Sequence, residues 1–280
     1  MFETFDAVIV FVFGLIFGSF ANVCIYRMPR DLSIIKPDSH CTKCNGFIKW
    51  YDNIPVISYI LLKGKCRNCG TKISFIYPFM ETLCGLAFLS MYFLYGFSYM
   101  LFPFCILVFS LLVITAIDFE FQIIPDEFSF LLMIVGFLSS FFNFMLGDTV
   151  LQRILNSFLG FVAGGGSLLV IAVVGKWIFK KDAMGGGDIK IMAGVGTFLG
   201  WEKVLFAIFI ACFIGSIVGL FLIVSKKIVR KQEIAFGPYL ALSSYLTLFL
   251  PAPATIINYM FLLEEKFLIK YVFTNLQNLR

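Results

Sequence analysis

The sequence predicts an all-α polytopic membrane protein with about eight (seven to eight) transmembrane helices and a cysteine-bearing loop between the first two. Its 280 residues are 60% hydrophobic and only 14% charged. A soluble domain has about 45–50% apolar and about 25% charged residues, so too little polar surface would remain to cover a water-soluble core. Most of the apolar runs also have the roughly 20 residues that a bilayer crossing requires.

Polar and glycine-rich breaks separate the predicted spans. The run over 189–200 is short for a span, so we expect it to cross tilted or in a thinned membrane. The tail from Ala254 is consistent with either a further weak span or a surface helix. The predicted spans are 7–25, 77–95, 101–117, 128–146, 154–179, 189–200, 203–224 and 235–250.

Three regions follow from these spans. Residues 1–100 form an N-terminal region with the first two spans and the polar loop 27–77. Residues 101–231 form the membrane core, and 232–280 hold the C-terminal span or spans and the tail.

The basic residues predict the orientation in the membrane. Glu3 and Asp6 precede the first apolar run, whereas Arg27 and Arg30 follow it. This order is the reverse of a cleavable signal, so we expect the first helix to be retained with the N-terminus outside. Cytoplasmic loops are enriched in Lys and Arg, which explains the basic clusters without nucleic-acid binding. Of the 22 Lys and Arg, 17 lie in three clusters that this topology puts in the cytoplasm: 27–72, 176–190 and 226–231.

Two C-x2-C pairs occur in the loop 27–77. Cys41 and Cys44 form the first, Cys66 and Cys69 the second, with 21 residues between the pairs. This separation is just beyond the usual zinc-ribbon spacing, and four thiolates can hold Zn²⁺ tetrahedrally. The alternative of two disulfides conflicts with a reducing cytoplasm. A closed four-cysteine site is structural, and we expect His40, the only histidine, to be a bystander.

Two aspartates stand where the predicted topology makes an acid costly. Asp188 follows Gly185, Gly186 and Gly187, which interrupt a helix and let the backbone approach another chain closely or take a positive φ. Asp118 ends the span 101–117, where a negative charge opposes the helix dipole. Acids near hydrocarbon are rare and usually functional. Both aspartates are expected at the cytoplasmic membrane edge.

Two carboxyl groups that meet near hydrocarbon share one proton, so one acts as a base toward water and the other as an acid toward a carbonyl oxygen. This is aspartic protease chemistry, which needs no histidine and no catalytic metal. The three glycines would admit an extended peptide beside Asp188. Lys190 is expected to point away from Asp188 and to snorkel.

Other polar residues near the membrane have two possible roles. Ser19 and Asn22 share a helix face, either as helix–helix contacts or as a polar lining near a substrate path. Glu81 either favours a helix N-terminus or belongs to a site. Asp126 follows Pro125 and is expected to cap a helix start rather than to act as a catalyst.

A series of motifs in order resembles the type IV prepilin peptidases, the membrane aspartic proteases of bacterial pilus, type II secretion and competence systems. Thr42 stands where this family often has proline, which leaves the four cysteines intact. The matching motifs are Gly18-Ser19-Phe20-x-Asn22-Val23 with Arg27-x-Pro29, both cysteine pairs, Trp50 to Pro55, Tyr77-Pro78-x2-Glu81, Asp118 to Asp126, Gly185-x-Gly187-Asp188-x-Lys190 and Phe236-Gly237-Pro238.

The resemblance implies that Asp118 and Asp188 are the catalytic pair. It implies cleavage of the basic leader of a prepilin or pseudopilin after a glycine, at the cytoplasmic face of the bacterial inner membrane. It also implies N-methylation of the new N-terminal residue with S-adenosylmethionine. The loop 27–77 would take part in methylation, although the sequence shows no nucleotide-binding fingerprint, and the donor-binding residues and the oligomeric state stay unassigned.

Two other functions are compatible with parts of the pattern. A proton-coupled transporter or channel would use the two acids as a relay, but it predicts acids near the bilayer midplane. A zinc-organised scaffold would leave the cost of Asp118 and of the three glycines unexplained.

Overall fold

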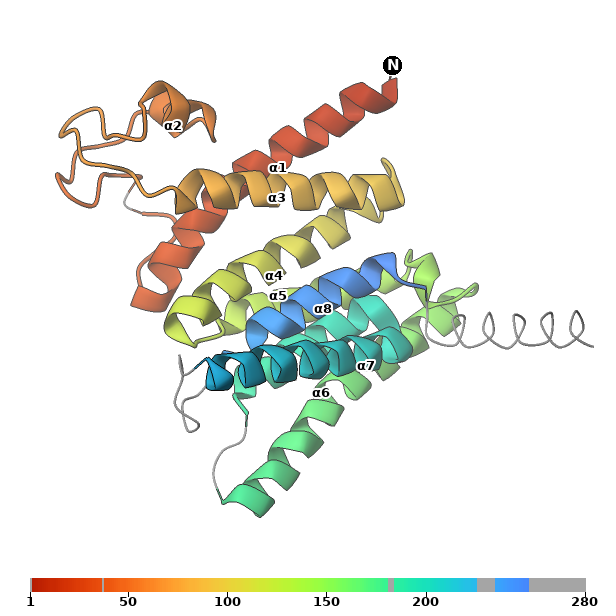
Figure 1. Cartoon of the computed structure of the whole chain (residues 1–280). Helices are drawn as coiled ribbons and strands as arrows, with labels where there is room; N and C mark the ends of the chain where they lie inside the picture. Colours follow the sequence, from red (N-terminus) through yellow and green to blue (C-terminus); the bar gives the residue numbers. More distant parts are fainter. Residues whose placement is uncertain (1, 37, 181–183, 226–234, 252–280) are drawn as a thin grey trace, which may run out of the picture.

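The computed structural model describes residues 2–36, 38–180, 184–225 and 235–251, and within these ranges the chain is helical with two isolated β-bridges (Figure 1). The predicted all-α class is confirmed. Short 3-10 turns lie at Met28–Arg30, Trp50–Asn53 and Phe144–Leu146. The α-helices are α1 (Phe2–Arg27), α2 (Ile57–Leu61), α3 (Ile76–Tyr95), α4 (Leu101–Phe121), α5 (Asp126–Ser140), α6 (Val150–Phe179), α7 (Gly186–Val224) and α8 (Gly237–Phe249).

Five of these helices, α1, α3, α4, α6 and α7, are long and apolar enough to cross a membrane. The boundaries around α5 and α6 differ from the sequence prediction. The span expected over 128–146 ends as α5 at Ser140, because the chain turns through Phe144–Leu146, and α6 already begins at Val150. Thr149 and Gln152 form a capping box there, which fixes the earlier start of α6.

Helix α7 reverses direction at Gly200, whose φ of 76° and ψ of 173° break the helix. A Cβ added to Gly164 of α6 would contact both Met192 and Val204. In a straight helix these two residues would lie about 18 Å apart. The chain therefore folds back at Gly200 into two adjacent helical segments, in line with the predicted runs 189–200 and 203–224, although the first segment starts at Gly186.

The first segment of α7 is short but its last carbonyl groups are satisfied. The Asn143 side chain donates to the Phe198 carbonyl at 2.8 Å, and the Ser157 hydroxyl donates to the Thr197 carbonyl at 2.9 Å. These bonds replace the backbone partners that a helix end lacks. The reversal is thus stable inside the bundle.

Glycines bring α6 and α7 together. A Cβ on Gly160 or Gly164 would strike the α7 backbone at Gly196 or Met192, and a Cβ on Gly165 would lie 3.0 Å from the Cβ of Ala193. Gly164 and Gly165, the first two of three consecutive glycines, therefore pack closely against α7. Gly166 does not, because a Cβ there would meet nothing within 4 Å.

Helices α4, α5 and α8 lie between α1 and α3 on one side and α6 and α7 on the other (Figure 1). The α4 residues Leu107, Ile114 and Ile117 are fully buried. Phe104 of α4 stacks on Tyr95 of α3, with ring centres 4.4 Å apart, and meets Phe198 of α7 edge-on at 5.6 Å. Helix α4, whose C-terminal end carries Asp118, is therefore enclosed by the other helices.

Candidate active site and metal centre

Asp118 lies in the last turn of α4 and is only 5% exposed. The sequence prediction that the span ends at 117 is wrong by one turn, since the helix continues to Phe121. Gln122 then ends it in a left-handed conformation, with φ of 55°, and its N–H donates to the Asp118 carbonyl at 3.0 Å. The aspartate side chain is thereby part of a regular helix and faces the bundle interior.

The N-terminus of α8 holds the Asp118 carboxylate. The Gly237 N–H donates a hydrogen bond of 2.9 Å to Oδ2 of Asp118. A Cβ on Gly237 would lie 2.6 Å from the same oxygen, so only glycine fits here. The sequence pattern assigns Gly237 no function beyond its motif, although a glycine followed by Pro238 at a helix start is a usable signal.

Asp188 is the third residue of α7 and is 7% exposed. Its Oδ1 is buried and has no hydrogen-bond partner among the described residues. Asp118 lies near enough to interact with it electrostatically. The structure thus brings together the two aspartates that the sequence analysis singled out.

The three glycines before Asp188 have different surroundings. A Cβ on Gly187 would lie 2.6 Å from the Cβ of Ile124, which belongs to the segment just after α4. A Cβ on Gly186 would meet nothing within 4 Å, and one on Gly185 would meet only Oδ2 of Asp188, at 3.6 Å. None of the three takes a positive φ. The close approach is therefore made by Gly187, and the positive φ is not used.

A further contact joins the helix that carries Asp188 to α5. The Lys190 Nζ donates to both carboxylate oxygens of Asp126, at 2.7 and 2.8 Å. Asp126 lies in the first turn of α5, as expected, but Pro125 occupies the cap position, and the Asp126 side chain pairs with Lys190 instead of capping. Lys190 therefore ties α7 to α5, a contact that the sequence did not predict.

The four predicted cysteines form one group, with all Sγ atoms within 4.8 Å of one another. All four are free thiols, so no disulfide competes. Sγ of Cys41 and Sγ of Cys69 are 3.9 Å apart. Tetrahedral zinc with bonds of about 2.3 Å needs sulfurs about 3.8 Å apart, so the residues fit the ion. A hydrogen bond with Thr71 lowers the pKa of Cys69 to about 6. At Cys44 a bond with the Gly46 backbone acts in the same direction, but the neighbouring thiols Cys69 and Cys41 outweigh it and raise the pKa to about 11.

The two cysteine pairs lie in equivalent turns. The Asn45 N–H donates to the Cys41 carbonyl and the Gly70 N–H donates to the Cys66 carbonyl, both at 2.9 Å. Asn45 and Gly70 each have a positive φ, of 53° and 67°. Asparagine and glycine tolerate this conformation best. The two cysteine pairs therefore have the same turn geometry.

Contacts around the cluster leave His40 outside it. His40 is not in the group of metal-ligating side chains, and its Nδ1 lies 3.0 Å from the Asp38 carbonyl. Arg67 pairs with Asp52 at 2.6 Å and lowers the pKa of that carboxyl group. This ion pair fastens the second cysteine turn to the Trp50–Asn53 turn.

The cysteine loop and the aspartates lie at the same end of the bundle. The guanidinium of Arg30 lies 4.4 Å from the ring centre of Tyr26 and 4.9 Å from that of Phe121. Tyr26 is at the end of α1, where the loop begins, and Phe121 ends α4, three residues after Asp118. One cation thus bridges the two features.

The fold and the site together define a class: a helical membrane protein with two buried carboxyl groups that interact electrostatically at one bundle end, which also carries a four-cysteine loop. Residues 12–95 match the bacterial peptidase A24 N-terminal domain, and residues 105–220 match the type IV leader peptidase family. The chain belongs to the type IV leader peptidase family. It is accordingly an inner-membrane protein, and the predicted resemblance is confirmed.

Several relatives named prepilin leader peptidase/N-methyltransferase support this assignment. The protein of Neisseria gonorrhoeae is 35% identical over 84% of this chain and 87% of its own length. The one of Bacillus subtilis (strain 168) is 31% identical, over 85% of this chain and 92% of its own. No solved structure matches the chain significantly. The comparisons give no support to the transporter or channel alternative.

Proposed function

We propose that this protein removes the basic leader of type IV prepilins or pseudopilins as an aspartic endopeptidase and then N-methylates the new N-terminal residue. The relatives carry both activities in their names. The observation that carries the peptidase half is the pair of buried carboxyl groups, Asp118 from α4 and Asp188 from α7, at one end of the bundle.

The surroundings of the two carboxyl groups support separate tasks for them. Asp118 accepts a backbone N–H at the N-terminus of α8, where the helix dipole favours negative charge. Asp188 has no donor at Oδ1. We therefore assign the base to Asp118 and the shared proton to Asp188.

In the reaction, Asp118 takes a proton from water as the water oxygen bonds to the scissile carbonyl carbon. Asp188 gives its proton to the carbonyl oxygen. When the tetrahedral intermediate collapses, the C–N bond breaks and the amine leaves with a proton from Asp118, while Asp188 recovers its own. Such general acid–base steps each contribute about 10²- to 10⁴-fold.

The glycines before Asp188 support a peptide path. Gly185 and Gly186 are exposed, and a side chain at Gly186 would meet nothing within 4 Å. A substrate backbone can therefore approach Asp188 from this side. Gly187 has another role, because its contact with Ile124 sets the distance between the two catalytic segments.

We assign the N-terminus to the outside and the acid pair and cysteine loop to the cytoplasm. The three basic clusters support this orientation through the positive-inside rule. The Arg30 bridge supports a common side for both features. A prepilin whose apolar helix lies in the bilayer would then present its leader at the inner edge, where the two aspartates lie.

The activities divide among three regions in this proposal. Residues 1–100 hold the structural zinc on Cys41, Cys44, Cys66 and Cys69 and contribute to methylation. Residues 101–231 carry the peptidase pair. Residues 232–280 complete the peptidase site, because the Gly237 N–H binds Asp118.

Asparagine variants test the pair. Asp118→Asn and Asp188→Asn would be co-expressed with a prepilin substrate, and leader removal followed by gel shift. We expect each change to abolish processing, whereas Glu120→Gln, an exposed acid in the same turn as Asp118, should process normally. Processing that survives both asparagine changes would overturn the proposal.

A further inference from the structure

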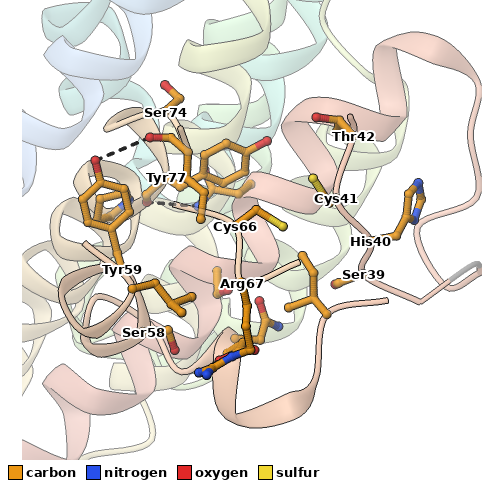
Figure 2. Close-up of a pocket in the computed structure, with 18 of the residues that line it drawn as sticks. Ser39, His40, Cys41, Thr42, Ser58, Tyr59, Cys66, Arg67, Ser74 and Tyr77 are labelled. Atoms are coloured by element: carbon orange, nitrogen blue, oxygen red, sulfur yellow. Dashed lines mark hydrogen bonds and ion pairs between the residues drawn. The ribbon is translucent and has the colours of Figure 1, made fainter. Parts of the chain in front are cut away.

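A cavity of about 650 Å³ lies between the cysteine loop and the polar ends of α1 and α3 (Figure 2). Ser19, Asn22 and Tyr26 of α1 line it, together with Tyr77 and Glu81 of α3 and a series of loop residues. Neither Asp118 nor Asp188 lines it. Its volume is in the range of small-molecule sites, roughly 300–1,000 Å³, and it is separate from the peptidase pair.

Glu81 is a buried carboxylate on the wall of this cavity. It is 8% exposed, accepts the Val56 N–H at 2.7 Å, and lies within hydrogen-bonding reach of the Ser19 hydroxyl. Among the described residues it forms no ion pair. A buried charge without a counter-charge is strongly unfavourable. Glu81 therefore either stays protonated or meets a cationic partner that enters the cavity.

The other acid on the cavity wall is already neutralised. Asp52 is paired with Arg67 at 2.6 Å. Among the described acids that line the cavity, only Glu81 is without an ion pair. Four basic residues also line it: Arg27, Lys49, Arg67 and Lys72.

The helix contact beneath Glu81 fixes its position. A Cβ on Gly18 of α1 would lie 2.5 Å from the Cα of Glu81. Asn22 of α1 donates to the Tyr77 carbonyl at 3.1 Å. Ser19 and Asn22 therefore combine the two roles left open by the sequence, since they join α1 to α3 and also line a ligand path.

Aromatic rings supply further affinity for a cation. Tyr59 and Tyr77 line the cavity, and Figure 2 shows both on the side away from His40. Tyr26 also lines it, but its ring already contacts the guanidinium of Arg30. Tyrosine faces attract organic cations within about 6 Å. The cavity thus suits a small organic cation that also has apolar and hydrogen-bonding parts.

We infer that this cavity binds the methyl donor S-adenosylmethionine, with Glu81 facing its sulfonium charge. The inference rests on the methyltransferase half of the proposed function. In the transfer, the lone pair of the substrate's N-terminal amine bonds to the methyl carbon as the carbon–sulfur bond breaks. The electron pair stays on sulfur, which leaves a neutral thioether, and the product amine carries the positive charge until it releases a proton to water. Glu81 thus faces a single positive charge before and after transfer.

The cavity lies near the end of α4, where cleavage would form the new N-terminus of the substrate. Tyr26 lines the cavity and contacts Arg30, which contacts Phe121 at the end of α4. Phe121 lies three residues beyond Asp118. The cavity and the two aspartates therefore lie at the same end of the bundle.

Calorimetry on the full-length protein in lipid nanodiscs tests the inference. S-adenosylmethionine and S-adenosylhomocysteine, its neutral thioether, would be titrated into wild type and Glu81→Gln. Glutamine keeps the size of the side chain and the acceptor for the Val56 N–H. We therefore expect the affinity for S-adenosylmethionine to fall about tenfold and the affinity for S-adenosylhomocysteine to fall less than about twofold. Glu202→Gln, in the second segment of α7, is the matched control and should bind both like wild type.

Equal losses for the two ligands, or none, would overturn the role of Glu81. Photo-crosslinking of labelled S-adenosylmethionine to wild type gives an independent measurement, with label expected within residues 19–81 and not within 101–225. Label in the latter range would overturn the site. If wild type methylates a cleaved pilin, but calorimetry shows no effect of Glu81→Gln and the label lies outside residues 19–81, the inference is wrong and the proposed function stands. If wild type neither binds nor methylates, the methyltransferase half fails with it.

Discussion

The Gly237 N–H lies 2.9 Å from Oδ2 of Asp118, and a methyl group on Gly237 would lie 2.6 Å from the same oxygen. Gly237 therefore donates a hydrogen bond to the carboxylate and, because it has no side chain, leaves room for that carboxylate. The two residues are 119 positions apart in the sequence, so the last described helix completes a site that begins on α4.

Gly237→Ala should inactivate the peptidase. The added methyl group forces Asp118 away from the α8 N-terminus, and a displacement of about 1 Å can reduce a rate roughly 100-fold. The measurement is leader cleavage by purified protein under single-turnover conditions. Gly215→Ala is the matched control, because a Cβ there would lie 3.4 Å from the nearest atom of Phe236, an acceptable contact. Equal activity of the two variants would contradict the role of Gly237.

The triple glycine allows a comparison within one motif. Gly187→Ala puts a Cβ 2.6 Å from that of Ile124, and overpacking of this kind costs about 1–3 kcal/mol. We expect it to move Asp188 away from Asp118 and to lower kcat at least about tenfold. Gly186→Ala should retain kcat, since its Cβ would meet nothing within 4 Å. If substrate passes beside Gly186, the variant should have a higher KM. A Gly186→Ala variant with the lower kcat of the two would show that the Ile124 contact is unimportant.

The sequence predicted those parts of the site that carry a chemical signature. Four cysteines in two short pairs and two acids at span ends were recognisable from residue type and spacing, because few structural roles explain them. The partners Gly237 and Ile124 were not, because glycine and isoleucine are common in membrane helices and their roles depend on contacts across the bundle. Glu81 was ambiguous for a similar reason. The alternative that it favours a helix N-terminus is wrong, because α3 begins at Ile76 and has no acid in its first turn; the cavity and the lack of an ion pair favour a site role. The helix boundaries near Asp118 and Leu146 depended on local turns that hydropathy does not report.

The four-cysteine cluster should hold about one zinc ion per chain. Cys66→Ser removes one thiolate, so we expect zinc loss by elemental analysis and increased proteolysis within residues 38–75. Methylation should fall more than cleavage, since Cys66 borders the cavity between the loop and α3 and not the aspartates. Cys212→Ser, an exposed thiol on α7 outside the group, should retain zinc. A wild-type protein without zinc, or Cys66→Ser with full zinc, would contradict this prediction.

Helix α6 positions Asp188 indirectly, and two neighbouring glycines on it test this. A Cβ on Gly164 would strike the Met192 carbonyl, one turn after Asp188, whereas a Cβ on Gly166 would meet nothing within 4 Å. The Met192 carbonyl is part of the backbone, so α7 must move to make room for the added methyl group. Gly164→Ala should therefore cost about 1–3 kcal/mol of stability and reduce leader cleavage. Gly166→Ala should stabilise the helix by up to about 1 kcal/mol and leave cleavage unchanged. Thermal unfolding in detergent, read beside leader cleavage, separates the two effects. If Gly164→Ala matched Gly166→Ala in both measurements, the α6 contact would have no influence on the position of Asp188.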